Sequence, residues 1–299
     1  MPELPEVEVV RRGVQRWATD GEITAVDILD KRSLRRHHSG PENFTAQLIG
    51  QHLSAGQRRG KYLWLPFDNG FRAIIVHLGM SGQLLICQPG MPDQKHLKIR
   101  ITYTTAEGIY ELRFVDQRIF GGLYLDTLVP TQDHPEELIP NTIAHIGRDP
   151  LDKHFDTEVI FRKLRARKSN LKRALLDQSL SSGIGNIYAD EALFRAKLHF
   201  GRPTETLTRK EVTRVYQAAE EVMRLALAQG GTSFDALYVN VNGESGYFAR
   251  SLNVYGRQGQ PCLRCQKSGI EIQITRTKFM NRSAYFCPRC QPVPRRARW

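Results

Sequence analysis

The second and third residues of the chain, Pro2 and Glu3, could together perform covalent chemistry. If Met1 is removed, Pro2 presents a free secondary amine, a nucleophile that an ordinary polypeptide has nowhere else. An amine that attacks an electrophilic carbon forms an imine, and the neighbouring carboxyl group can assist departure of the leaving group. These two residues therefore predict a lyase reaction that passes through a Schiff base.

The same residues also have a structural interpretation. Proline is common in the first turn of a helix, and apolar residues recur at helical spacing between Glu6 and Ala18. The positive N-terminal end of such a helix lowers the pKa of a nearby amine, which favours the reactive form of Pro2. The opening residues alone leave both interpretations open.

Four of the five cysteines form two Cys-x2-Cys pairs, separated by residues 266–286: Cys262, Cys265, Cys287 and Cys290. Paired thiolates at this spacing predict one structural Zn²⁺ ion, with disulfides as the alternative in an oxidising compartment. No redox cofactor is expected. Cys87 follows an apolar run and is expected to be a buried, inert thiol.

The charge balance indicates a polyanionic partner. The 299 residues include 43 Lys and Arg against 31 Asp and Glu, a net charge of +12. Nucleic acid is the first candidate and an anionic membrane the second. Because the chain has neither an apolar run of about 18 residues nor a signal-peptide pattern at its start, we expect a soluble protein that is not secreted.

The elements that must position these residues change in character along the chain. Short apolar or alternating segments, bounded by Gly and Asp, predict an antiparallel sandwich or barrel: 23–28, 61–67, 71–78, 83–87, 98–103, 108–115 and 122–125. Helical spacing follows at 157–166, 170–176, 187–196 and 209–229. We therefore predict an α+β multidomain protein with a β-rich domain at 1–134, a helical domain at 135–252 and a zinc ribbon with a basic tail at 253–299.

Several motifs occur in order along nearly the whole chain: MPELPEVE at 1–8, RGKY at 59–62, HLGMSG at 77–82, DQRIFG at 116–121, GIGNIYADE at 183–191 and the four-cysteine module. In this combination the chain resembles the formamidopyrimidine-DNA glycosylase branch of the Fpg/Nei family. The resemblance implies a β-sandwich, a helix-two-turn-helix region and a zinc finger. It also implies a monomeric, bacterial-type cytoplasmic enzyme that associates with the nucleoid and binds damaged double-stranded DNA.

The activity implied by the resemblance is bifunctional base excision repair. Members excise oxidised purines, namely 8-oxoguanine and formamidopyrimidines, and then cut the abasic strand by β,δ-elimination. The resemblance assigns the Schiff base to Pro2, the acid to Glu3, β-elimination to Lys61 and δ-elimination to Arg282. From spacing alone, Lys61 could be a solvated strand end, and Arg282 could be an ordinary basic residue of the ribbon.

The resemblance also implies DNA contacts. His96, Lys168 and Asn186 match DNA-contact positions, and Lys98 and Lys172 lie nearby and would add positive charge. Asn186 is expected to cap the following helix, where exposed N–H groups form a phosphate site.

Another group is implied to act on the lesion itself. Enzymes that act on a base in a duplex extrude the nucleotide, and Met80, Arg118 and Phe120 match the residues that fill the vacated space. Glu6 and Tyr247 are assigned to the substrate site, with Tyr247 at the end of a glycine-containing loop at 240–247 that closes over the extruded base.

Two other functions remain possible at this point. An endonuclease VIII-like glycosylase acts on oxidised pyrimidines, but such proteins typically begin Pro-Glu-Gly-Pro-Glu, whereas this chain has Leu4. A DNA-binding zinc protein without catalysis would not need Pro2, Glu3 and Lys61 together. Borohydride trapping on abasic DNA separates the catalytic from the non-catalytic interpretation.

Overall fold

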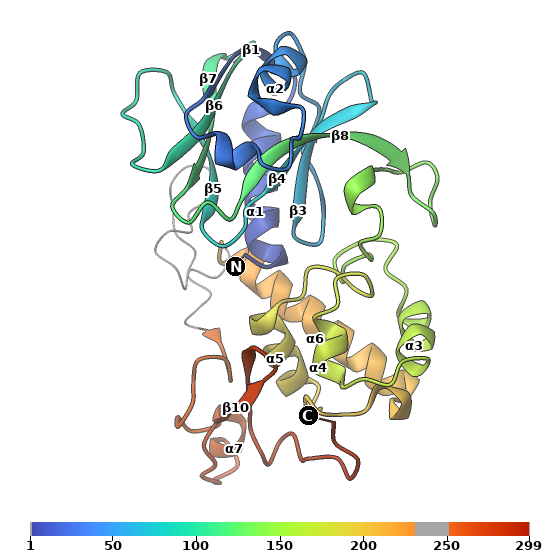
Figure 1. The fold of residues 1–299 in the computed structure, drawn as a ribbon. Coiled ribbons are helices and arrows are strands. Elements are labelled where there is room, and N and C mark those ends of the chain that lie inside the picture. The colour runs from blue at the N-terminus through green and yellow to red at the C-terminus, as the bar shows by residue number, and fades with distance from the viewer. Residues whose placement is uncertain (1, 231–250, 299) are drawn as a thin grey trace. The chain divides into compact units, whose positions relative to one another are not determined.

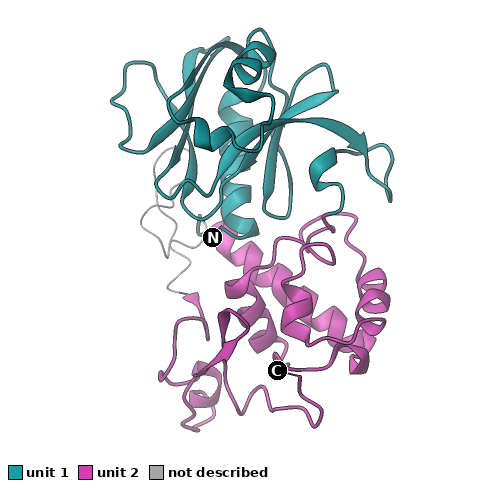
Figure 2. Ribbon diagram, viewed as in Figure 1, with its two compact units in different colours: residues 1–145, 229–247 teal, residues 146–228, 248–299 magenta. Residues whose placement is uncertain are grey.

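The computed structural model describes residues 2–230 and 251–298, so the predicted loop at 240–247 and Tyr247 lie outside the described residues. The chain forms two compact units (Figure 2), residues 1–145 with 229–247 and residues 146–228 with 248–299. The second unit contains both the predicted helical segments and the cysteine module. The three-domain division at 134 and 252 stays a prediction.

Two antiparallel sheets form the framework of the first unit (Figure 1). One has the order β1 (Glu22–Ile28), β6 (Leu97–Thr105), β7 (Gly108–Asp116) and β5 (Gly82–Cys87). The other has the order β2 (Gln57–Arg59), β3 (Tyr62–Pro66), β4 (Arg72–His77), β8 (Gly122–Pro130) and β9 (Leu138–Pro140). The predicted sandwich is therefore confirmed, and the barrel alternative is wrong.

Helix α1 (Leu4–Ala18) contributes to a core that both sheets share. Its residues Val7, Val10 and Val14 are buried in the same cluster as Phe114 of one sheet and Ile74 of the other. Because α1 also contacts β2, β3 and β5, the start of the chain is fixed against strands of both sheets. Because Pro2 lies just before α1, the packing of this helix determines where Pro2 lies.

Short elements complete the first unit: the 3₁₀ turn η1 (Lys31–Leu34), helix α2 (Gly40–Leu48) and the 3₁₀ turn η2 (Asn141–Ile143). The periodicity did not predict α2, because only Phe44 and Leu48 of its nine residues are buried. A helix with so narrow an apolar face carries a weak sequence signal.

The second unit is helical and ends in a small hairpin. It contains α3 (Thr157–Arg165), α4 (Leu171–Leu175), α5 (Asn186–Arg195), the 3₁₀ turn η3 (Thr204–Thr206), α6 (Arg209–Ala228), α7 (Leu263–Gln266), β10 (Thr275–Phe279) and β11 (Arg282–Phe286). Helix α5 packs against α4, α6 and β11. Among the described residues, no helix is long and apolar enough to cross a membrane.

Candidate functional site

Pro2 and Glu3 lie immediately before α1, and both are buried. Glu3 is the N-cap residue, and its backbone N–H donates to the carboxylate of Glu6 at 2.8 Å. A carboxylate in the first turn is also favoured by the helix dipole. Glu6 thus holds the backbone of Glu3 in place; its predicted role as a substrate contact stays a prediction.

Lys61 lies in the two-residue turn between β2 and β3, where Gly60 has a φ of +58° that favours glycine. A chain of contacts connects this turn to α1. Arg58 donates to the carboxylate of Glu8 at 3.1 Å and to the carbonyl oxygen of Gly60 at 3.0 Å. The helix that begins beside Pro2 and the turn that carries Lys61 are therefore joined by polar contacts.

Glu8 is well suited to organise this connection. Burial raises the pKa of Glu8, but the guanidinium groups of Arg11, Arg58 and Arg12 outweigh it and lower the pKa to about 2. Glu8 is 8% exposed and lies within 3.1 Å of all three arginines. An ionised carboxylate therefore holds Arg58 in the orientation that reaches Gly60.

Met80, Arg118 and Phe120 lie on two adjacent loops of the first unit. Met80 follows β4, whereas Arg118 and Phe120 lie between β7 and β8, and all three side chains are exposed. The loops meet backbone to backbone: a Cβ atom on Gly79 would lie 2.5 Å from the Gly121 nitrogen. The structure thus brings together the three residues predicted to fill the vacated stack.

His96 directly precedes β6 and is half-buried, and its carbonyl oxygen accepts the N–H of Asp116 at 3.0 Å. Lys98 lies in β6 and forms an ion pair. Its ammonium group lies 3.2 Å from the carboxylate of Asp30, which also pairs with Arg32 at 2.7 Å. One carboxylate therefore faces two cations, and an additional DNA contact by Lys98 stays a prediction.

In the second unit, the expected cap of α5 is wrong. Gly185 is the N-cap residue, and Asn186 is the first residue of the helix. The side-chain amide of Asn186 donates instead to the carbonyl oxygen of Ser283 at 3.1 Å. Asn186 therefore connects α5 to the hairpin. Its predicted contact with a phosphate stays a prediction.

Lys172 does not contribute an exposed charge, contrary to expectation. Its side chain is fully buried, and its ammonium group lies 2.7 Å from both the carboxylate of Asp190 and the carbonyl oxygen of Ser283. The other carboxylate oxygen of Asp190 accepts the N–H of Tyr285 at 3.0 Å. Lys172 is therefore structural, while Lys168 remains exposed at the surface.

Arg282 is exposed at the start of β11, directly after the two-residue hairpin turn. It lines a pocket of about 440 Å³ with Arg167 and Ser169, which precede α4, and Arg173, which lies within it. Arg167 also pairs with Asp177. Guanidinium groups and a hydroxyl around one pocket suit a phosphate group, and Lys168 lies in sequence between two of the lining residues.

The four cysteines converge as their spacing predicts, and all are free thiols. Their sulfur atoms lie within 4.8 Å of one another, with Cys265 and Cys290 at 3.5 Å, Cys265 and Cys287 at 3.7 Å, and Cys262 and Cys290 at 3.9 Å. Four sulfurs bound tetrahedrally at 2.3 Å are separated by about 3.8 Å. The four cysteines are therefore positioned to hold one metal ion, with both pairs contributing although residues 266–286 separate them.

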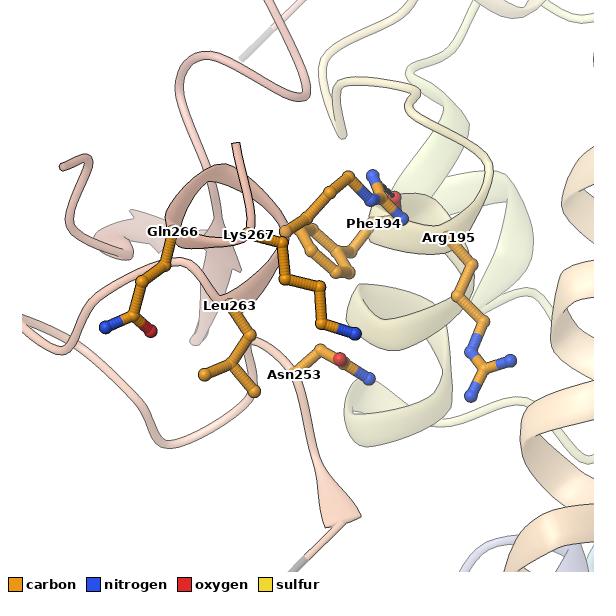
Figure 3. A pocket seen from close by; sticks show the side chains of 7 residues that line it. Phe194, Arg195, Asn253, Leu263, Gln266 and Lys267 are labelled. Carbon is orange, nitrogen blue, oxygen red and sulfur yellow. Dashed lines mark hydrogen bonds between the residues drawn. The ribbon is translucent and has the colours of Figure 1, made fainter. Parts of the chain in front are cut away.

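A second pocket, of about 560 Å³, lies at the C-terminal end of α5 and contains none of the predicted site residues (Figure 3). There the Arg264 guanidinium lies over the ring of Phe194 at 4.1 Å and donates to its carbonyl oxygen at 2.9 Å. One turn earlier, Glu191 accepts the backbone N–H groups of 253–255 at 2.7–3.0 Å. These contacts attach the cysteine module to α5.

Sequence reasoning missed several residues that position the predicted site: Glu8 and Arg58 beside the Lys61 turn, and Ser81, Asp116 and Arg35, which bind one another or the backbone of the loop that carries Phe120. Glu8, Ser81 and Asp116 lay inside the motifs but were assigned no role. For Glu8 and Asp116 the available signal was charge on otherwise apolar elements, because a charged residue is rarely buried without a partner. Cys87 is buried, as predicted.

Comparisons with known proteins agree with this geometry. Residues 1–123 match the family model of the formamidopyrimidine-DNA glycosylase N-terminal domain, and residues 146–236 match that of the formamidopyrimidine-DNA glycosylase H2TH domain. Formamidopyrimidine-DNA glycosylase of Streptomyces coelicolor is 55% identical over 295 residues, covering 99% of each chain. The enzyme of the same name from Thermobifida fusca is 54% identical over 303 residues, covering 100% of both chains.

Solved structures show the same similarity. The complex between Lactococcus lactis Fpg and DNA containing an abasic site is 29% identical, with a TM-score of 0.80, covering 97% of this chain and 99% of that one. A complex of a variant of that protein with DNA containing Fapy-dG has a TM-score of 0.81 at 29% identity, covering 97% of this chain and 100% of the other.

Proposed function

The chain belongs to the formamidopyrimidine-DNA glycosylase family, and from this premise we propose that it removes oxidised purines from duplex DNA and cleaves the resulting abasic strand. It is a DNA glycosylase of base excision repair. The observation that carries the mechanistic proposal is the buried Pro2-Glu3 pair at the start of α1, joined through Glu8, Arg58 and Gly60 to the turn that carries Lys61.

The proposed reaction begins at Pro2 after removal of Met1. Its nitrogen attacks C1′ of the sugar, the bond from C1′ to the damaged base breaks, and Glu3 supplies the proton that assists ring opening and base departure. The resulting Schiff base acidifies the neighbouring sugar carbon. Lys61 promotes β-elimination, which expels the phosphate on the 3′ side, and Arg282 assists δ-elimination, which expels the phosphate on the 5′ side.

DNA binding is proposed to involve both units. Lys168, Asn186, Arg282 and His96 contact the DNA backbone, while Met80, Arg118 and Phe120 occupy the space that the extruded nucleotide leaves. The cysteines hold one structural Zn²⁺ ion, which organises the hairpin that carries Arg282. The protein acts as a monomer on chromosomal DNA in the cytoplasm.

Borohydride trapping tests the proposed nucleophile. With abasic duplex DNA, sodium borohydride should reduce the Schiff base to a stable adduct whose peptide map contains Pro2. Pro2→Gly should lose most of the trapping but keep DNA affinity, because the charge distribution is unchanged. An adduct at Lys61 would overturn the assignment of Pro2, and absence of any adduct would favour the non-catalytic DNA-binding alternative.

Lesion preference tests the substrate assignment. Duplexes that contain 8-oxoguanine or a formamidopyrimidine should be cleaved faster than duplexes that contain an oxidised pyrimidine. Faster cleavage of the pyrimidine lesion would support the endonuclease VIII-like alternative. Curated relatives named formamidopyrimidine-DNA glycosylase support the purine assignment.

A further inference from the structure

The loop between β7 and β8 holds an apolar side chain in solvent. Phe120 is 51% exposed, and Met80 on the adjacent loop is 40% exposed. Between Arg118 and Phe120, Ile119 has a φ of +55°, a left-handed conformation that is costly for a β-branched residue. Such a conformation persists only where surrounding contacts impose it. The contacts of this loop therefore show what holds Phe120 in its exposed position.

The N–H groups of the loop are held by a buried carboxylate. One oxygen of Asp116 accepts from the Ser81 hydroxyl at 2.6 Å and from the Arg118 N–H at 3.2 Å, and the other accepts from the Gly121 N–H at 2.7 Å. Asp116 is 0% exposed. It therefore ties the Phe120 loop to the Met80 loop from the interior.

The carbonyl groups of the same loop are held from the other side by one side chain, that of Arg35. Its guanidinium donates to the carbonyl oxygens of Ile119 at 3.0 Å, Phe120 at 2.6 Å and Gly121 at 2.9 Å. Arg35 directly follows η1 and is exposed, more than 80 residues from the loop in sequence. A planar guanidinium can satisfy three successive carbonyls because its N–H donors point in fixed directions.

We propose that Arg35 is a positioning residue that presents Phe120 to the space left by the extruded nucleotide. This inference rests on the proposed function. Arg35 acts through the loop backbone, not on the reacting atoms. Without it, the loop loses its carbonyl contacts and is held by Asp116 alone, so the loop would open more often and Phe120 would sample other orientations. The step that suffers is base extrusion from a duplex, whereas Schiff-base chemistry at an existing abasic site is retained.

The chain offers a matched control in Arg32, three residues earlier. Arg32 is also exposed, but its guanidinium pairs with the carboxylate of Asp30 at 2.7 Å. Arg32→Ala removes the same charge from the same surface without touching the Phe120 loop. Arg35→Lys keeps the charge but replaces the planar fork by a single ammonium group, which cannot hold the three carbonyls in the same way.

Single-turnover rates on two duplexes, one with 8-oxoguanine and one with an abasic site, test the proposal. Arg35→Ala and Arg35→Lys should both slow lesion excision by roughly tenfold or more, since several charge-assisted hydrogen bonds are lost, and should change abasic-site cleavage by less than about threefold. Arg32→Ala should resemble the unmodified protein on both. In a Phe120→Ala background, Arg35→Ala should cause little further loss of excision rate, because Arg35 acts only by positioning the Phe120 ring.

Three outcomes would overturn the proposal: equal losses on both duplexes, rescue by Arg35→Lys, or additive effects with Phe120→Ala. The first two would identify Arg35 as a phosphate contact. If the unmodified protein processes neither duplex, the proposed function fails instead. Hydrogen exchange then tests the role of Arg35 without activity. The Arg118 and Gly121 amides should exchange faster in Arg35→Ala and not in Arg32→Ala. Unchanged exchange in Arg35→Ala would show that Arg35 does not hold the loop.

Discussion

Lys172 and Asp190 form a fully buried ion pair, with 2.7 Å between the ammonium nitrogen and the carboxylate oxygen. The pair connects α4 to α5, and both partners also bind the hairpin: Lys172 through the carbonyl oxygen of Ser283 and Asp190 through the N–H of Tyr285. Arg282 directly precedes Ser283. The ion pair therefore determines where the hairpin places Arg282 relative to the N-terminus of α5.

Replacing Lys172 by Met should destabilise the second unit strongly. Burial raises the pKa of Asp190, and the ammonium group of Lys172 opposes that effect. Removing one partner of a buried pair typically costs about 3–5 kcal/mol, because the other charge is left uncompensated. Urea unfolding should show this loss, and the double change Lys172→Met with Asp190→Leu should recover part of it. The exposed Lys168→Ala is the control, and an equal loss there would contradict this role for Lys172.

Local sequence patterns predicted those parts of the structure that depend on neighbouring residues, namely most helices and strands and the cysteine cluster. The apolar runs and alternations of β1 and β3–β8, and the helical spacing of α6, predicted these elements, whereas the three-residue strands β2 and β9 were not predicted. The cysteine pairs likewise carry their geometry in their spacing. The ends of these elements shifted by a few residues at most, apart from β8, which runs five residues beyond its predicted end.

Long-range polar contacts were not predictable in the same way. Lys172 lies 111 residues from Ser283, Arg35 lies 85 residues from Phe120, and Glu8 lies 50 residues from Arg58. Nothing in the spacing around Lys172 distinguishes a buried ion pair from an exposed cation. Charged residues within helices and strands that also carry apolar residues could therefore be noticed from the sequence, but their partners could be identified only once the fold was known.

The cysteine cluster should be required for both metal content and DNA affinity. Cys287→Ser removes one of four converging sulfurs from a module with little apolar core, so the variant should lose zinc and bind DNA weakly. Metal analysis and binding to an abasic duplex measure the two effects. Cys87→Ser is the control and should retain both, because Cys87 lies in β5 of the first unit. Stoichiometric zinc in Cys287→Ser would argue against this site.

The stability of the first unit should fall on mild acidification. Burial, together with Arg36 and Arg35, lowers the pKa of His77 from 6.5 to about 4. Because the unfolded chain binds this proton more readily, stability is complete above about pH 6.5 and is lost as the pH falls towards 4. The loss attributable to His77 near pH 5.5 should be on the order of 1 kcal/mol.

Urea unfolding at pH 7.5 and 5.5 measures this dependence. His77→Gln should show a smaller loss between the two pH values than the unmodified protein. Some loss should persist, because burial also lowers the pKa of His199 in the second unit to about 4. An unchanged loss in His77→Gln would show that His77 does not titrate in this range.

Lys168 should act as a sequence-independent DNA contact. Its side chain is exposed beside the arginine-lined pocket that contains Arg282. Lys168→Ala should weaken binding to undamaged and damaged duplexes alike and reduce the slope of log affinity against log salt by about one unit. A loss confined to damaged DNA would instead indicate that Lys168 takes part in lesion recognition.

Phe120→Ala should separate base extrusion from strand cleavage. The ring is exposed on a loop whose backbone is held by Asp116 and Arg35, so its removal should not affect folding. Without a wedge, the vacated stack stays unfilled, and excision of 8-oxoguanine from a duplex should slow substantially. Cleavage at an existing abasic site needs no base extrusion and keeps its nucleophile, so single-turnover rates there should change little. Equal losses on both substrates would mean that Phe120 is a general packing residue, and its assignment as the wedge would have to be abandoned.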